Sequence, residues 1–304
     1  MQPGVERAIV FVSDHGHTIA AAGGSPRPSV DERFPIGSVT KSFTATIVLQ
    51  LVQEKKLRLD GTLGHYLPGV VRYGNAITIR ELLQHRSGLR DPSLKAVNSA
   101  LAASLSLRPI DALRLVGSKP LAFEPDMQWE YSNTNYVALG LIIEKVTGHT
   151  YSEELASRIL KPLALHATSL ATAQPIERVT SAAGAIVSDV RDVARFYSAL
   201  LSGRLLSRPM LARMEQTDPD GVGSGGFTTF SNAYVGDGLG IFATDAPCGR
   251  FWGHSGGFRN WVTSASVSIK RARVVIAAVR VRTFPGFKPF WREADSRPLF
   301  CSSF

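Results

Sequence analysis

Residues 34–41 read Phe-Pro-Ile-Gly-Ser-Val-Thr-Lys and are followed by a helical pattern that continues to about Lys55. Apolar residues then recur at the spacing of one helix face, at Phe43, Ile47 and Leu51. Ser38 is therefore expected in the first turn of a helix, and Lys41 follows three residues later on the same face. The stretch marks the point where a β-type opening of the chain changes to helical structure.

Runs typical of strands lie at both ends of the chain. Residues 7–12 and 17–22 flank Asp-His-Gly at 14–16, which predicts an opening hairpin. After about Leu239, four more strand-like runs follow, at 239–243, 250–254, 261–269 and 273–283. We therefore expect an α+β fold of the α/β sandwich type, in which an antiparallel sheet is built from both termini and an all-helical domain is inserted.

The domain boundaries follow from this pattern. Residues 1–33 and 234–304 should form the sheet domain, residues 34–233 the mainly helical domain, and the active site should lie at their interface. Three further helices are expected from their capping signals: one from the Thr78 capping box to about Gly88, one over 135–147, and one over 189–201 capped by Ser188.

The composition is that of an ordinary globular protein. Of the 304 residues, 44% are hydrophobic and 19% charged, which excludes disordered and fibrous classes. Cys248 and Cys301 are too few for a disulfide framework or a four-cysteine zinc site. The net charge is +9, and much of the excess lies after residue 270. No nucleic-acid module accompanies it, so a solvated basic face is expected and no nucleic-acid partner.

The sequence contains no transmembrane segment, because no uncharged apolar stretch reaches the ~18 residues that span a bilayer. The only apolar run in the first twenty residues, 8–12, is too short for the core of a secretory signal. If Met1 is the native start, we expect a cytoplasmic protein.

Ser38 and Lys41 have the arrangement of an activated nucleophile. The amine can reach the hydroxyl, and the free N–H groups at a helix start can stabilise an oxyanion beside Ser38. A Ser-x-x-Lys spacing also arises by chance about once in such a chain, so a capped surface helix is the alternative.

Two other segments carry candidate chemistry. Tyr131-Ser132-Asn133 precedes a helix; a Tyr beside a cationic Lys can have a lowered pKa, and an Asn amide can orient Lys and a substrate carbonyl. Residues 252–257, Trp-Gly-His-Ser-Gly-Gly, end a predicted strand with glycines that let a backbone approach a ligand. The competing interpretations are an Asn cap with a core Tyr, and a structural His.

In this order, the three segments resemble the serine β-lactamase and penicillin-binding DD-peptidase superfamily, especially its branch of class C β-lactamases, D-Ala-D-Ala carboxypeptidases and family VIII esterases. The resemblance covers residues 5 to about 280. Other matching segments are Phe34-Pro35-Ile36-Gly37, Leu57-Arg58-Leu59-Asp60, residues 77–89 (Ile-Thr-Ile-Arg-Glu-Leu-Leu-Gln-His-Arg-Ser-Gly-Leu) and residues 183–188 (Ala-Gly-Ala-Ile-Val-Ser).

The resemblance implies an acyl-enzyme formed on Ser38. Lys41 and Tyr131 would share the task of taking the hydroxyl proton and passing it to the leaving group. The backbone N–H groups of Ser38 and Gly257 would form the oxyanion hole. Asn133 would hold Lys41 and the substrate.

The third segment would complete the site. His254 would lie beside Tyr131 and supply a donor or a cation, and Ser255 and Gly256 belong with it to the substrate-binding edge. No metal and no other cofactor is implied.

The expected partner is a small-molecule acyl substrate, an ester, amide or lactam, with water or another acyl acceptor. His-Ser-Gly in the third segment favours esterases, peptidases and acyltransferases. A D-Ala-D-Ala carboxypeptidase, a class C-like β-lactamase and a penicillin-binding sensor without turnover are the competing hypotheses.

The end of the chain departs from the family pattern. Residues 284–291 are too rich in Pro and aromatic residues for a normal closing helix. Either this tail or a partner subunit in a homo-oligomer is therefore expected to cover one face of the sheet.

Overall fold

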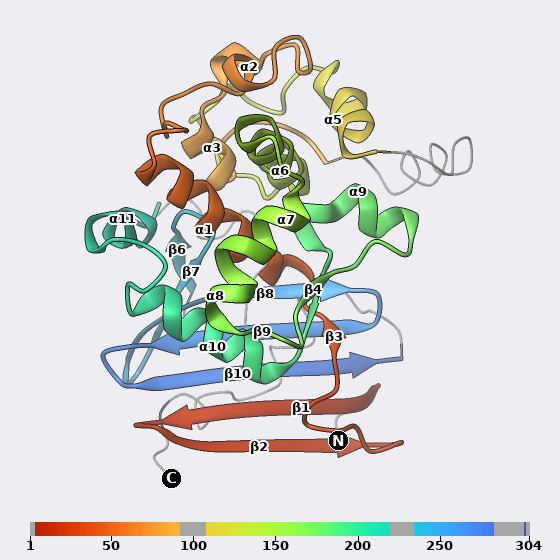
Figure 1. Cartoon of the computed structure of the whole chain (residues 1–304), viewed down its shortest axis with the longest axis vertical. Helices are drawn as coiled ribbons and strands as arrows, with labels where there is room; N and C mark the ends of the chain where they lie inside the picture. The colour runs from red at the N-terminus through yellow and green to blue at the C-terminus, as the bar shows by residue number, and fades with distance from the viewer. Residues whose placement is uncertain (1–3, 92–107, 219–233, 283–300, 302–304) are drawn as a thin grey trace.

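The computed structural model describes residues 4–91, 108–218, 234–282 and 301. Its centre is an antiparallel seven-stranded sheet of order β2-β1-β10-β9-β8-β7-β6 (Figure 1). The strands are β1 (Val5–Asp14), β2 (His17–Gly24), β6 (Tyr234–Asp237), β7 (Phe242–Ala246), β8 (Gly249–Phe258), β9 (Trp261–Ser268) and β10 (Arg273–Val281). Strand β1 pairs with β10, Val10 opposite Ala277. The prediction of one antiparallel sheet built from both ends of the chain is confirmed.

Alternating side chains give the sheet two apolar faces. Along β10, Val274 and Ile276 join the main core, while Val275 and Ala277 belong to a second cluster with the opposite orientation. Val262 of that second cluster is fully buried within the single chain. The expectation that the tail or a partner subunit in a homo-oligomer covers one face of the sheet stays a prediction. Residues 283–300 and 302–304, to which the prediction for the tail applies, lie outside the described residues.

The helices of the described residues are α1 (Thr40–Gln53), α2 (Leu63–Tyr66), α3 (Ile79–Leu83), α5 (Pro109–Gly117), α6 (Asn133–Thr147), α7 (Tyr151–Leu155), α8 (Lys161–Leu163), α9 (Pro175–Gly184), α10 (Val190–Leu201) and α11 (Arg208–Met214). In Figure 1, α10 lies over one face of the sheet, whereas α2, α3, α5 and α6 lie above the sheet, away from its strands. The 3-10 turns are η1 (Gly37–Val39) and η2 (Gly74–Ala76), and η3 (Ala156–Leu160) is a π turn. Helix α10 packs directly on β1, β9 and β10. The domain boundaries at residues 33 and 234 stay a prediction.

A second, small sheet was not predicted and holds the start of the first helix. Its order is β3 (Phe34–Pro35), β5 (Ile186–Ser188) and β4 (Ser169–Leu170). The Ile36 N–H extends this pairing by donating to the Ile186 carbonyl at 3.0 Å. Because Ile36 comes just before η1, the small sheet fixes the position of Ser38.

Several helix ends differ from the sequence prediction. Ser188 was expected to cap the helix over 189–201, but Ser188 ends β5, and the Asp189 carboxylate caps α10 by accepting from the Asp192 N–H at 2.7 Å. The helix after the Thr78 capping box was expected to reach about Gly88. It ends at Leu83, because the chain turns at His85, whose φ is +59°.

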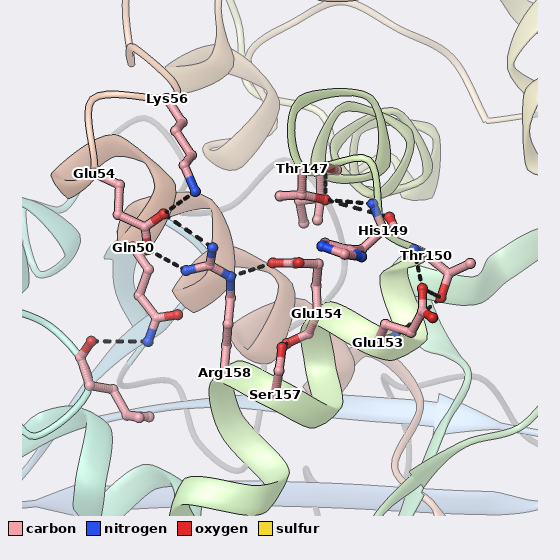
Figure 2. A network of polar contacts seen from close by, with 12 residues as sticks. Gln50, Glu54, Lys56, Thr147, His149, Thr150, Glu153, Glu154, Ser157 and Arg158 are labelled. Atoms are coloured by element: carbon pink, nitrogen blue, oxygen red, sulfur yellow. Dashed lines mark hydrogen bonds and ion pairs between the residues drawn. The ribbon is translucent and has the colours of Figure 1, made fainter.

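An ion-pair network fixes the far end of α1 (Figure 2). The Arg158 guanidinium bridges Glu54, just after α1, and Glu154 of α7. One of its contacts, Nη2 to Glu54 Oε2, measures 3.1 Å. Lys56 adds a contact of 3.0 Å to Glu54. The pairs link α1 to the segment that follows α6, so the helix carrying Lys41 is held at both ends.

A disulfide joins Cys248, in the turn between β7 and β8, to Cys301. It ties the end of the chain to the sheet. In the described part of the chain, no helix combines the length and the apolar character needed to cross a membrane.

Candidate active site

Ser38 and Lys41 lie side by side at the start of α1. Ser38 is in η1 and Lys41 in the first turn of α1, and Lys41 Nζ lies 3.1 Å from Ser38 Oγ. The sequence predicted this proximity, although the serine lies in a 3-10 turn and not in the α-helix itself.

Lys41 is completely buried and fully hydrogen-bonded. Besides Ser38, Nζ donates to Asn133 Oδ1 at 2.8 Å and to the Ala183 carbonyl at 2.7 Å. Burial disfavours the charged form and lowers the Lys41 pKa to about 7, against the opposing charge of Asp91. A neutral amine can keep its two N–H groups on Asn133 and Ala183 and direct its lone pair at the Ser38 hydroxyl. This is the arrangement of a general base.

Tyr131 lies beside the lysine. Lys41 Nζ is 4.9 Å from the centre of the Tyr131 ring. Burial raises the Tyr131 pKa above its ordinary value, although the nearby Ser38 side chain acts to lower it. The sequence-based expectation of a lowered tyrosine pKa is therefore wrong. Desolvation affects both groups and favours neutral Lys41 with neutral Tyr131.

The third segment lies within β8, not at its end as predicted, and packs tightly on η1. A Cβ on Gly256 would lie 2.0 Å from the Ile36 carbonyl oxygen and 2.9 Å from the Ser38 nitrogen. A Cβ on Gly37, where φ is +54°, would lie 2.6 Å from the Gly257 nitrogen. The backbone nitrogens of Ser38 and Gly257 thus border one junction that only glycines permit.

His254 is buried and neutral. Burial lowers its pKa to about 3, and the nearby Lys41 lowers it further, so the ring is not the cation that the sequence allowed. Nδ1 lies 2.5 Å from the Ser255 carbonyl, which only accepts, so Nδ1 carries the proton. Nε2 is then an acceptor, and it has no hydrogen-bond partner among the described residues.

His85 is a part of the site to which the sequence assigned no role. Its ring stacks on Tyr131 with centroids 4.3 Å apart, and its Nδ1 accepts from the Ser132 N–H at 3.1 Å. Burial lowers its pKa well below the ordinary value, so His85 is neutral. It lies within the segment 77–89 that carried the family resemblance, which was the available signal.

The assembled groups are a serine, a buried amine that can accept its proton, a tyrosine ring beside the amine, and two backbone nitrogens at one junction. Among the residues described, no group of three or more His, Cys, Asp or Glu is placed to hold a metal ion. A nucleophile candidate beside a buried amine, at the start of α1, is an arrangement that suits nucleophilic catalysis by a serine.

The family follows from the comparison with known proteins. The family model described as "Beta-lactamase" matches residues 2–287, so the chain belongs to the beta-lactamase family.

Similar solved structures cover nearly the whole chain. A D-stereospecific amidohydrolase from a Streptomyces species is 32% identical, with a TM-score of 0.79 and coverage of 91% of this chain and 90% of that one. A D-amino acid amidase from Ochrobactrum anthropi SV3 is 25% identical, with a TM-score of 0.81 and coverage of 95% and 90%. These relatives support serine hydrolase activity in general.

The similarity to curated sequences is more partial. Penicillin-binding protein 4 of Amycolatopsis lactamdurans is 34% identical over 172 residues, which are 54% of this chain and 44% of that protein. The chain thus spans less than half the length of this curated relative.

Proposed function

We propose that the chain is a serine hydrolase that forms an acyl-enzyme on Ser38 from a small-molecule amide or ester. The proposal rests on the position of Lys41: its Nζ lies 3.1 Å from Ser38 Oγ, and burial lowers the Lys41 pKa to about 7. An amine that is half neutral near pH 7 can remove the hydroxyl proton where an ordinary lysine cannot.

Acylation would proceed as follows. Ser38 Oγ attacks the carbonyl carbon while its proton moves to Lys41 Nζ, and the backbone N–H groups of Ser38 and Gly257 receive the oxyanion. The bond to the leaving group breaks as Lys41, through the Tyr131 hydroxyl, returns the proton to that group. Water, or another bound acceptor, then releases the acyl group by the same proton transfers in reverse.

Amides of D-amino acids are the substrates to test first. The support is similarity to the D-stereospecific amidohydrolase and the D-amino acid amidase. His254, Asn133, Ser255 and Gly256 remain the other proposed substrate contacts.

A D-Ala-D-Ala carboxypeptidase is the second candidate, favoured by the match to a penicillin-binding protein. The same site chemistry would also suit a class C-like β-lactamase or a penicillin-binding sensor without turnover. The cytoplasmic location and a homo-oligomer also stay predictions. The Cys248–Cys301 disulfide argues against the cytoplasm, since such bonds persist mainly in oxidising compartments.

The test combines active-site labelling with a substrate panel. A fluorophosphonate should modify Ser38, and Ser38→Ala should lose both labelling and turnover, while Ser118→Ala, at an exposed serine after α5, keeps both. D-phenylalanine amide, its L enantiomer, a p-nitrophenyl ester, nitrocefin and a D-Ala-D-Ala peptide then compete as substrates. Turnover of the D-amide above the others supports the proposal. Labelling at another serine, or full activity of Ser38→Ala, overturns it.

A further inference from the structure

Asp91 binds three consecutive residues at the start of α6. Its Oδ1 accepts from the Thr134 N–H at 2.9 Å, from Ser132 Oγ at 2.9 Å and from Thr134 Oγ1 at 3.2 Å. Its Oδ2 accepts from Asn133 Nδ2 at 2.7 Å. One carboxylate therefore fixes the backbone of this turn and also the side chain of Asn133.

The contact with Asn133 decides which way its amide points. A carboxylate only accepts hydrogen bonds, so the NH₂ end of the amide must face Asp91. The carbonyl end then faces Lys41, where Asn133 Oδ1 accepts from Nζ at 2.8 Å. Lys41 Nζ is in turn 3.1 Å from Ser38 Oγ. A continuous chain of contacts leads from the Asp91 carboxylate to the nucleophile.

We propose that Asp91 is a positioning residue for the base Lys41: it fixes the orientation of the Asn133 amide and places a negative charge near the amine. The proposal rests on the proposed function of Ser38 and Lys41. Asp91 is not assigned any contact with the substrate.

Loss of Asp91 should have two separate effects on Lys41. Without the carboxylate, the Asn133 amide can rotate and turn its NH₂ group toward Lys41. Since Lys41 Nζ is itself a donor, it then loses the Asn133 oxygen that holds it in position beside Ser38. Removal of the negative charge also makes the protonated amine less favourable, since the Asp91 charge raises the Lys41 pKa against the effect of burial.

The other titratable groups around Lys41 do not carry a compensating charge. Tyr131 and Tyr136 place their rings 4.9 and 5.4 Å from Nζ, and burial raises the pKa of both. His85 and His254 have pKa values lowered by burial and by Lys41, so both are neutral near pH 7. The charge of the buried Asp237 raises the pKa values of Tyr131 and Tyr136 further, which keeps both tyrosines neutral.

The experiment measures the rate of Ser38 labelling by a fluorophosphonate between pH 5 and 9. Asp91→Ala should slow labelling about 10- to 100-fold at pH 9, because a mispositioned base costs roughly that much. Asp91→Asn, which keeps the shape, should move the acid-side midpoint to lower pH. Its deficit should therefore shrink as the pH falls below the wild-type midpoint. Asp111→Asn, at a half-buried acid in the first turn of α5, is the matched control and should leave the profile unchanged.

A purely structural role in capping α6 would give a different result. It would lower the melting temperature of Asp91→Asn and leave the labelling midpoint where it is in the wild type, and that outcome overturns the proposal. In a double-mutant cycle, Asp91→Ala combined with Asn133→Ala should label no more slowly than Asn133→Ala alone, apart from a shift in midpoint. If the rate losses of Asp91→Ala and Asn133→Ala multiply in the double variant at pH 9, that result also overturns the proposal.

The two proposals fail in distinguishable ways. Absence of Ser38 labelling in the wild type refutes the proposed function, and the role of Asp91 with it. Normal wild-type labelling with identical midpoints in the wild type and Asp91→Asn refutes the role of Asp91 alone.

Discussion

Lys41 Nζ lies 3.1 Å from Ser38 Oγ in a position from which solvent is excluded, and burial lowers the Lys41 pKa to about 7. The nucleophile and its proposed base thus come from one turn of the chain. The rest of the fold buries the amine, and this desolvation keeps part of it neutral, and so able to accept a proton, near pH 7. Both buried histidines of the site have pKa values below the usual range.

The rate of acylation should therefore follow the titration of Lys41. Only the neutral amine accepts a proton, so the rate should fall about tenfold per pH unit below a midpoint near 7 and level off above it. Lys41→Arg, whose guanidinium keeps its charge, should be inactive across the range. Labelling rates from pH 5 to 9 measure this. A flat profile, or an active Lys41→Arg variant, contradicts the assignment.

Lys41 and Tyr131 should act as one unit. Lys41 contacts both Ser38 and the Tyr131 ring, and the proposed mechanism passes one proton through both side chains, so Lys41→Ala or Tyr131→Phe alone should lose nearly as much kcat/KM as the double variant. Tyr73→Phe, at a partly exposed tyrosine in another part of the fold, serves as the control and should keep wild-type activity. Losses that multiply independently would show two separate functions.

The parts of the fold that could be predicted are those with periodic patterns or local capping. Strand β10 alternates between two apolar faces, and the box at Thr78 marks a helix start within four residues. Strands β3, β4 and β5 have only two or three residues, too few to show a period, and they were missed. Ser188 was read as a cap because its pairing with Phe34, across the fold, is not visible locally.

The site shows the same division. The chemical types and order of Ser38, Lys41, Tyr131 and His254 were available from the sequence. The role of Asp91 was not, because its partner Asn133 lies 42 residues away along the chain. The tyrosine pKa was predicted in the wrong direction because lysine is usually exposed and charged, and nothing in the sequence announces that Lys41 is buried.

Arg158→Met should destabilise the fold without changing the chemistry. It leaves the buried Glu154 carboxylate without its Arg158 contact, which costs about 1–3 kcal/mol. Arg58→Met removes an exposed pair with Asp60 and is the matched control, with no measurable change expected. Urea unfolding of both variants, compared with their Ser38 labelling rates, makes the test. Equal stability of the two variants would show that the network in Figure 2 holds nothing in place.

The same network should make part of the stability depend on pH. The hydrogen bond from Arg158 lowers the Glu54 pKa to about 2 from 4.5. A carboxyl with a lowered pKa adds stability that is fully present above 4.5 and is lost as the pH falls toward 2. The stability difference between wild type and Arg158→Met should therefore shrink between pH 4.5 and 2, as measured by unfolding at each pH. A difference that grows on acidification contradicts this assignment.

Gly256→Ala should abolish acylation although it adds one methyl group. Its Cβ would lie 2.0 Å from the Ile36 carbonyl oxygen and 2.9 Å from the Ser38 nitrogen, and both are backbone atoms, so β8 must move away from η1. That movement separates the backbone N–H groups of Ser38 and Gly257, and loss of one oxyanion donor costs about 100- to 1,000-fold. Gly23→Ala, with open space around its Cβ, should label like the wild type. Labelling rates and melting temperatures of both variants separate loss of the site from loss of the fold. Wild-type labelling of Gly256→Ala would show that the junction between η1 and β8 is not where the oxyanion is stabilised.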